Sequence, residues 1–160
     1  MGLDMYLTAE KYIGGYDFFP AEKAAYEAIL PHTGLASIAG GLSPSVTVKV
    51  NVAYWRKANE IHAWFVDNVQ NGVDECQESE VTAEQLAELR ESCANALAAY
   101  RIGDKDDAAS IMPTRAGFFF GGTEIDAYYA NTLEGTIETI DAVLAHPDVK
   151  KLRFFYQSSW

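Results

Sequence analysis

The sequence predicts an α+β fold, with a sheet of roughly four strands and helices packed mainly on one face of the sheet. Segments in which apolar and polar residues alternate occur near both ends and in the middle of the chain, as is typical of strands. Between them lie segments with apolar residues three or four positions apart, as is typical of helices. The chain has 160 residues, of which 49% are apolar, so a single globular domain over residues 1–160 is expected.

The N-terminal part is predicted to form two strands separated by a short helix. The first strand covers residues 3–13 and has an apolar residue at every second position, namely Leu3, Met5 and Leu7. The short helix covers residues 20–30 and begins with proline, which is favoured in the first turn. The second strand covers residues 45–52, SVTVKVNV, where valine alternates strictly with polar residues.

Two helices are predicted next. Residues 54–70 form the first, which Asn71 and Gly72 end. An acidic loop over residues 73–80 follows. The second helix runs to about residue 101, and Thr82 with Gln85 three positions later forms a capping box at its start.

The C-terminal part is predicted to contain a loop, two strands and a long helix. The polar segment GDKDDAAS at residues 103–110 favours a loop. Three phenylalanines between glycines, residues 118–120, indicate a short buried strand. Thr123 is expected to cap a helix over residues 124–145, and LRFFY at residues 152–156 forms the last strand.

The net charge of the chain favours some classes of binding partner and disfavours others. Lys and Arg total 12 against 23 Asp and Glu, which gives a net charge of -11. Direct nucleic-acid binding and binding to anionic membranes both need a basic surface and are therefore disfavoured. A basic protein partner is favoured, and the alternative is that the acidity only keeps the protein soluble. The chain has no apolar run long enough to span a membrane and starts with no signal segment, so a cytoplasmic location is expected.

The acidic residues between the two central helices and on the second of them form the first candidate site. Glu84, Glu88 and Glu91 lie one turn apart on one helical face. Such a face either is simply solvated or imitates the phosphates of a duplex and binds a basic surface. The predicted partner-binding residues are Asp74, Glu75, Glu78, Glu80, Glu84, Glu88 and Glu91.

The segment YWRKANEIHAWF, residues 54–65, holds the alternative site. At helical spacing Trp55, Asn59 and His62 share one face, where they could form the pocket edge of a binder or small enzyme that acts on a nucleotide-like molecule, with His62 as base or ligand contact. Arg56, Lys57 or Arg115 would then supply the phosphate contact. The competing interpretation is a core helix in which His62 makes local hydrogen bonds and Arg56 pairs with Glu60 four positions on.

Signatures of enzymes are missing from the sequence. It contains no G-x-S-x-G, H-E-x-x-H, C-x-x-C or phosphate-binding loop motif. We therefore expect no catalytic residues, no metal site and no cofactor. Cys76 and Cys93 are too few for a disulfide framework and are expected to be free thiols, with Cys93 a small core residue.

Several motifs together resemble a group of short accessory proteins of phages and prophages. They are MGLDMYL at the start, YWRKANEIHAWF, NVQNGVDEC, GFFFGGTEIDAYY and the closing FYQSSW. The resemblance implies a non-enzymatic inhibitor of a bacterial antiviral defence system, such as an anti-CRISPR protein. Such a protein would bind a nuclease or effector complex of the host, or would sequester a nucleotide-like signal molecule. A further hypothesis is a structural phage protein that works as a homo-oligomer, which exposed aromatic residues near Trp160 would favour.

Overall fold

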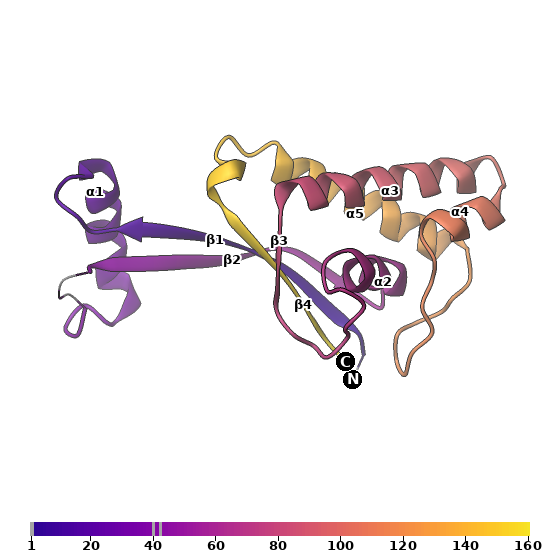
Figure 1. Cartoon of the computed structure of the whole chain (residues 1–160), viewed down its shortest axis with the longest axis horizontal. Helices are drawn as coiled ribbons and strands as arrows, with labels where there is room; N and C mark the ends of the chain where they lie inside the picture. The colour runs from indigo at the N-terminus through magenta and orange to yellow at the C-terminus, as the bar shows by residue number, and fades with distance from the viewer. Residues whose placement is uncertain (1, 40, 42) are drawn as a thin grey trace. The chain divides into compact units, whose positions relative to one another are not determined.

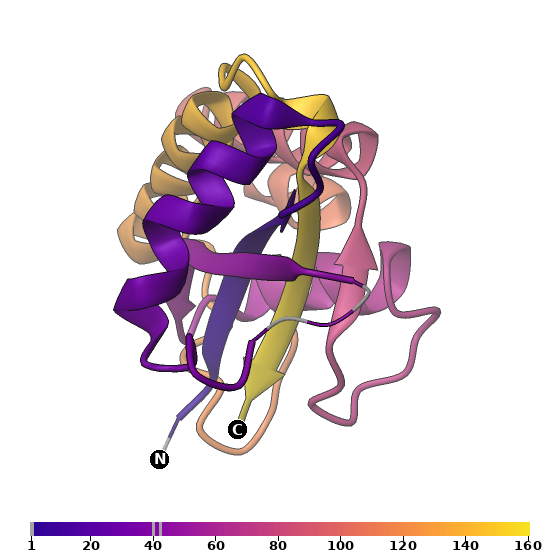
Figure 2. The same cartoon turned by 90° about the vertical axis from the view of Figure 1, so that its left-hand side faces the viewer.

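The computed structural model, which describes residues 2–39, 41 and 43–160, confirms the α+β class. Four strands form one antiparallel sheet in the order β2-β1-β4-β3 (Figures 1 and 2). In Figure 2 the yellow strand β4 lies between the indigo β1 and the pink β3. The elements are β1 (Asp4–Gly14), α1 (Pro20–Ile29), η1 (Leu30–Thr33), β2 (Ser45–Arg56), α2 (Asn59–Asn68), β3 (Ser79–Val81), α3 (Ala83–Arg101), α4 (Lys105–Ile111), α5 (Ala127–Leu144), η2 (Val149–Lys151) and β4 (Arg153–Ser159).

The chain divides into two compact units. The first consists of the residues up to Ala9 together with Asn51–Trp160, and the second consists of Glu10–Val50. Strands β1 and β2 contribute residues to both units. The expectation of one domain over residues 1–160 stays a prediction.

The second unit contains α1 and the parts of β1 and β2 that lie in it. Tyr26 is the buried residue of α1. A Cβ atom at Gly15 would lie 2.7 Å from the Tyr26 ring, so a residue without a side chain is needed at this position. Glu10 of β1 pairs with Lys49 of β2 at 3.3 Å.

The sheet of the first unit buries one face under helices. The predicted alternation in β1 is confirmed, since Leu3, Met5 and Leu7 are fully buried. Tyr156 of β4 stacks on Phe65 of α2, with ring centres 3.9 Å apart. Side chains of α3 and α5 belong to the same apolar core, among them Leu86, Leu89, Leu133 and Ile140.

Aromatic residues on the other side of these strands stay partly accessible. Tyr54 of β2 is 53% exposed and packs against Tyr6 of β1. Phe155 of β4 is half-buried, and the Arg153 guanidinium lies over its ring. The helices of this unit thus cover mainly one face of the sheet, as the sequence predicts.

The predicted helix over residues 54–70 is wrong at its start. Residues 54–56 continue β2, where buried and exposed side chains alternate over Ala53, Tyr54, Trp55 and Arg56. Lys57 has a positive φ of 57° and separates the strand from α2. Trp55 therefore does not share a helical face with Asn59 and His62.

Two further elements differ from the prediction. Residues 105–111 form α4 where a loop is expected, because the Asp104 carboxylate accepts a hydrogen bond from the Asp107 amide at 2.9 Å and caps the helix. Residues 79–81 form β3 inside the expected acidic loop, since they pair antiparallel with β4. Neither element is long enough to show a clear hydrophobic period.

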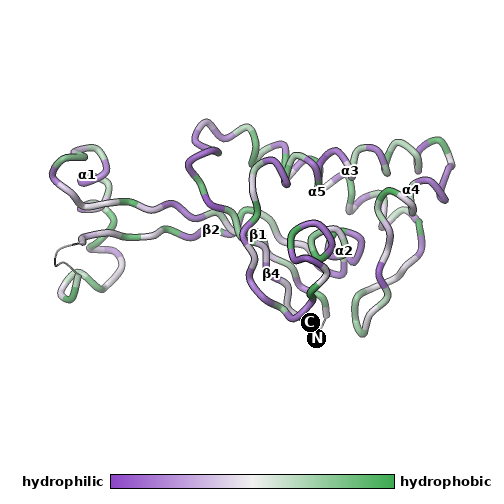
Figure 3. The backbone as a smooth tube through the Cα atoms, in the orientation of Figure 1, coloured by the Kyte–Doolittle hydropathy of each residue, from purple (hydrophilic) through white to green (hydrophobic). Residues whose placement is uncertain are grey.

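The predicted strand over residues 118–120 is wrong. These residues lie in the loop that joins α4 to α5, and its tip is hydrophobic (Figure 3). Phe118 is 84% exposed and Phe119 is 48% exposed, whereas Phe120 is buried. The cap of α5 is Asp126 rather than Thr123, with its carboxylate accepting from the amides of Tyr128 and Tyr129.

Other predicted elements are confirmed. Thr82 and Gln85 form both hydrogen bonds of the capping box at the start of α3. The last strand is present and extends to Ser159. Within the described residues, no helix combines the length and apolar character that crossing a membrane requires.

Candidate functional site

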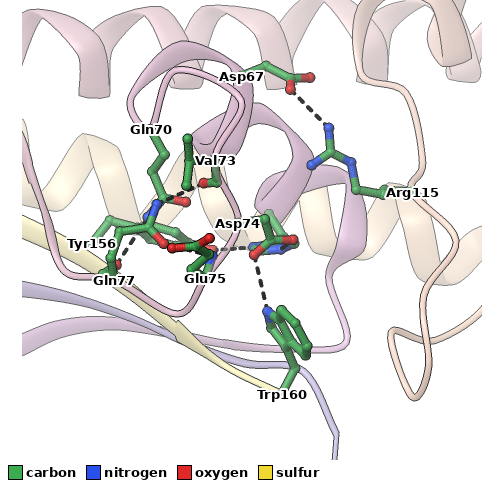
Figure 4. Close-up of polar contacts among 10 residues, drawn as sticks. Asp67, Gln70, Val73, Asp74, Glu75, Gln77, Arg115, Tyr156 and Trp160 are labelled. Atoms are coloured by element: carbon green, nitrogen blue, oxygen red, sulfur yellow. Dashed lines mark hydrogen bonds and ion pairs between the residues drawn. The ribbon is translucent and has the colours of Figure 1, made fainter.

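A chain of hydrogen bonds runs from the core to the C-terminus. His62 of α2 is fully buried, and its Nδ1 lies 2.7 Å from the hydroxyl of Tyr156 on β4. Its Nε2 lies 3.0 Å from a carboxylate oxygen of Asp74. The other oxygen of Asp74 accepts a hydrogen bond from the Trp160 indole at 3.1 Å (Figure 4). Strand, helix, loop and terminus are thereby joined through polar side chains.

The protonation states in this chain follow from burial. Burial lowers the pKa of His62, and the hydrogen bond to Asp74 offsets this only in part. The imidazole is therefore neutral at pH 7. Its Nε2–H donates to Asp74, so Nδ1 accepts from the Tyr156 hydroxyl. Burial also raises the pKa of Tyr156, which keeps this hydroxyl protonated.

The arrangement of Asp74, His62 and Tyr156 stabilises the fold rather than presenting a reactive group. Catalysis requires that a substrate reach the reacting atom within hydrogen-bond distance. His62 and Tyr156 are both 0% exposed, which prevents such contact in this conformation. Asp74, with a side chain 22% exposed, is the accessible member.

Replacing Tyr156 by Phe tests this structural role. The change removes the donor to His62 Nδ1 and leaves a buried acceptor without a partner, which costs about 1–3 kcal/mol. Urea unfolding measures the loss. The control is Tyr54→Phe, which removes a hydroxyl that bonds to Asp4 at the exposed surface and should cost under about 1 kcal/mol. Equal losses in the two variants would contradict the role of the buried chain.

Asn59 holds the loop between α4 and α5. Its side chain is 1% exposed. The Nδ2 group donates to the backbone oxygens of Phe120 at 3.3 Å and Gly122 at 2.8 Å. The Oδ1 atom accepts from the Arg115 amide at 2.9 Å. Close packing completes the attachment, because a Cβ at Gly121 would lie 2.9 Å from the backbone oxygen of Lys57.

The structure brings together only some residues of the predicted ligand edge. The Arg115 amide bonds to Asn59, whereas Trp55 and Arg56 lie in β2. Trp55 of β2 is buried and donates to the Thr136 hydroxyl on α5 at 2.9 Å. Arg56 lies 3.9 Å from Asp4. Arg115 pairs with Asp67 at 2.9 Å (Figure 4). The hypothesis that these residues bind a nucleotide-like ligand stays a prediction.

The predicted ion pair of Arg56 with Glu60 is wrong. Arg56 belongs to β2, whereas Glu60 lies in the first turn of α2 and is only 3% exposed. Sequence reasoning missed that Glu60 is buried. The sequence offered little to predict this burial. Residues 59–66 of α2 are all buried, so polar and apolar side chains do not separate into an exposed and a buried face there.

Asp74 and Glu80, which are predicted to bind a partner, interact within the protein. Asp74 belongs to the His62 chain, and Glu80 forms a double hydrogen bond with Arg153 at 2.9 and 3.1 Å. Glu75 and Glu78 are exposed in the loop before β3. Glu75 and Glu78 are therefore accessible to a partner, although the loop that contains them is held by the hydrogen bond of Asp74 to His62.

Glu84, Glu88 and Glu91 form what we call the α3 acidic face. All three are exposed, and no ion pair joins them to another described residue. The arginines of α3 instead pair with α5, Arg90 with Asp141 at 2.8 Å and Arg101 with Glu134 at 2.8 Å. Within α3 the charge of Glu91 helps to raise the pKa of Arg90, after the larger effect of Asp141, but this arginine forms its ion pair with α5.

The two cysteines differ in burial, since Cys76 is half-buried and Cys93 lies in the core. Both are free, and Cys93 is fully buried, as predicted. Burial raises the pKa of the Cys93 thiol to about 12, so it remains protonated and unreactive. In the described part of the chain, no group of three or more His, Cys, Asp or Glu side chains is placed to hold a metal ion.

Comparison with known proteins adds no assignment to this geometry. No family model, no curated protein and no solved structure matches the chain.

Proposed function

We propose that the protein is a phage or prophage accessory protein that inhibits a bacterial antiviral defence system by binding, without catalysis. It acts in the cytoplasm of the host on a basic surface that handles nucleic acid, as in a nuclease or a CRISPR effector. The α3 acidic face occupies that surface. The observation that carries the proposal is the exposure of Glu84, Glu88 and Glu91 without internal ion pairs.

The electrostatics of the chain support this proposal. Charged residues that lack an internal partner contribute most to steering and complementarity, because their field is not cancelled at short range. The spacing of one helical turn places the three carboxylates on a rigid line along α3. The chain as a whole is also negative, with a net charge of -11.

The first experiment measures phage plating on bacteria that carry one defence system each and express the chain. Restored plating on one system, and unchanged plating on the strain without defence, is the expected result. Plating that no system alters would overturn the proposal. A panel that includes restriction enzymes and several CRISPR types covers defence proteins with basic nucleic-acid grooves.

The second experiment locates the contact on α3. The variant Glu84→Gln/Glu88→Gln/Glu91→Gln should weaken binding to the identified defence protein by tenfold or more and reduce its salt dependence, since roughly three favourable charge contacts are lost. The matched control is Asp106→Asn/Asp107→Asn/Glu138→Gln, which removes the same charge at other exposed positions. Equal weakening by both variants would show that only net charge matters.

A further inference from the structure

The carboxylate of Glu60 is buried in an unusual environment. Its side chain lies in the first turn of α2 and is 3% exposed. The atom Oε1 has no hydrogen-bond partner among the described residues. Buried polar atoms in folded proteins are almost always satisfied, and an exception calls for an explanation such as a ligand.

Glu60 lines a cavity of about 150 Å³. The cavity lies at the N-terminal end of α5, where Asp126, Tyr128 and Tyr129 contribute to its wall. Thr114 and Glu124, from the loop between α4 and α5, also line it. An apolar cavity of about 150 Å³ accommodates a molecule as large as benzene, so this space suits a ligand of roughly six heavy atoms.

The lining is acidic. Glu60, Glu124 and Asp126 carry carboxylates, and no Lys or Arg from the described chain lines the cavity. The positive end of α5 does not compensate, because Asp126 already accepts from the amides of Tyr128 and Tyr129 at 2.8 and 3.2 Å. An anion is therefore excluded, and a cation is favoured.

The tyrosines favour an organic cation over a metal ion. The hydroxyl of Tyr128 donates to the backbone oxygen of Arg56, and that of Tyr129 donates to the backbone oxygens of Ala108 and Met112. With these hydroxyls engaged, the rings contribute apolar and π surface, which attracts ammonium and guanidinium groups. The carboxylates are also not clustered as metal ligands in the described residues.

We infer that this cavity binds a small organic cation, an ammonium or guanidinium compound, whose positive charge pairs with the Glu60 carboxylate. The inference is independent of the α3 acidic face and goes beyond the proposed inhibitor function. The bound cation satisfies the buried carboxylate, and the aromatic rings cover its apolar part.

Binding is coupled to the proton on Glu60. Burial, and after it the charge of Asp126, raises the pKa of Glu60 to about 7, and a hydrogen bond from the Glu60 backbone amide opposes the shift. Glu124, Tyr128 and Tyr129 share the cavity, and the Cys93 thiol on α3 is close enough for its pKa to be raised by Glu60. A cation binds the ionised carboxylate, so affinity rises with pH through this range and binding releases a proton.

The experiment is calorimetric titration of the full chain with methylguanidinium and methylammonium chlorides in EDTA. Methylurea, a neutral planar analogue of methylguanidinium, is the ligand control. We expect roughly millimolar binding of at least one cation and none of methylurea, in keeping with the few atoms of such ligands. Affinity should fall about tenfold from pH 8 to pH 6. The proton release appears as a dependence of the heat on the buffer.

Two variants make the result specific. Glu60→Gln keeps the shape of the side chain and should abolish both binding and its pH dependence. Glu138→Gln removes one exposed carboxylate of α5 outside the cavity and should bind as the unmodified chain does. Absence of binding by both cations, equal binding of methylurea, or binding that survives Glu60→Gln would each overturn the inference. Binding of Ca²⁺ or Mg²⁺ in place of the organic cations would overturn it as well.

Discussion

Replacing Glu60 by Gln is expected to change the free energy of unfolding more favourably at pH 8 than near pH 4. Burial raises the pKa of Glu60 from 4.5 to about 7. The folded state therefore holds a proton that the unfolded state loses between these values, so stability falls as pH rises through this window. The shift corresponds to a relative gain of about 3 kcal/mol for the Gln variant above pH 7.

The measurement is the free energy of urea unfolding for both proteins at pH 4, 5, 6, 7 and 8. His62 also makes stability depend on pH, because its pKa is lowered in the folded state and its contribution to stability falls as pH drops. Both proteins contain His62, so the difference between their free energies of unfolding reports on Glu60 alone. Glu138→Gln serves as the control for the loss of one carboxylate at an exposed position. A difference for Glu60→Gln that stays constant from pH 4 to 8 would contradict the burial of an ionisable carboxylate.

Replacing Asn59 by Ala is expected to destabilise the chain by about 3 kcal/mol or more, because three backbone groups lose their partner. The groups are the backbone oxygens of Phe120 and Gly122 and the amide of Arg115. These bonds attach the loop between α4 and α5 to α2, so the loop should also become more susceptible to proteolysis. Urea unfolding and limited proteolysis measure the two effects.

A matched control lies on α5. Asn131 is exposed, and no hydrogen bond of its side chain to another described residue is present. Its replacement by Ala should change stability by less than about 0.5 kcal/mol, since Ala favours a helix and no buried group loses a partner. Similar losses for Asn59→Ala and Asn131→Ala would show that the loop is held by apolar packing alone.

The same loop shows where periodicity misleads. Three consecutive phenylalanines between glycines have the composition of a buried strand, yet Phe118 and Phe119 are exposed. Their position depends on hydrogen bonds to Asn59, which is 61 residues from Phe120 in the sequence. A local pattern contains no information about such a distant contact. The loop was therefore beyond prediction from neighbouring residues.

The start of α2 is a second example. Trp55, Asn59 and His62 have helical spacing, but Trp55 is in a strand. The alternation of Val48, Val50 and Val52 with polar residues stops at Ala53, because the buried residues that follow, Ala53 and Trp55, stand at odd positions. The sequence pattern therefore does not carry the strand to Trp55, and helical spacing fits this stretch. Pairing with β1 selects the strand, because the Lys57 amide donates to the backbone oxygen of Leu3 at 2.8 Å.

The sequence by itself determined the features that depend on near neighbours. The strand around Met5, the capping box of Thr82 with Gln85 and the acidic spacing on α3 all follow from residues a few positions apart. Only the tertiary structure decided which polar groups are buried and what they meet. His62 meets Tyr156 across 94 residues, and Glu60 faces a cavity formed with the start of α5. The burial and the pKa of a side chain depend on distant segments of the chain, because these segments exclude water from it and bring other charges close to it.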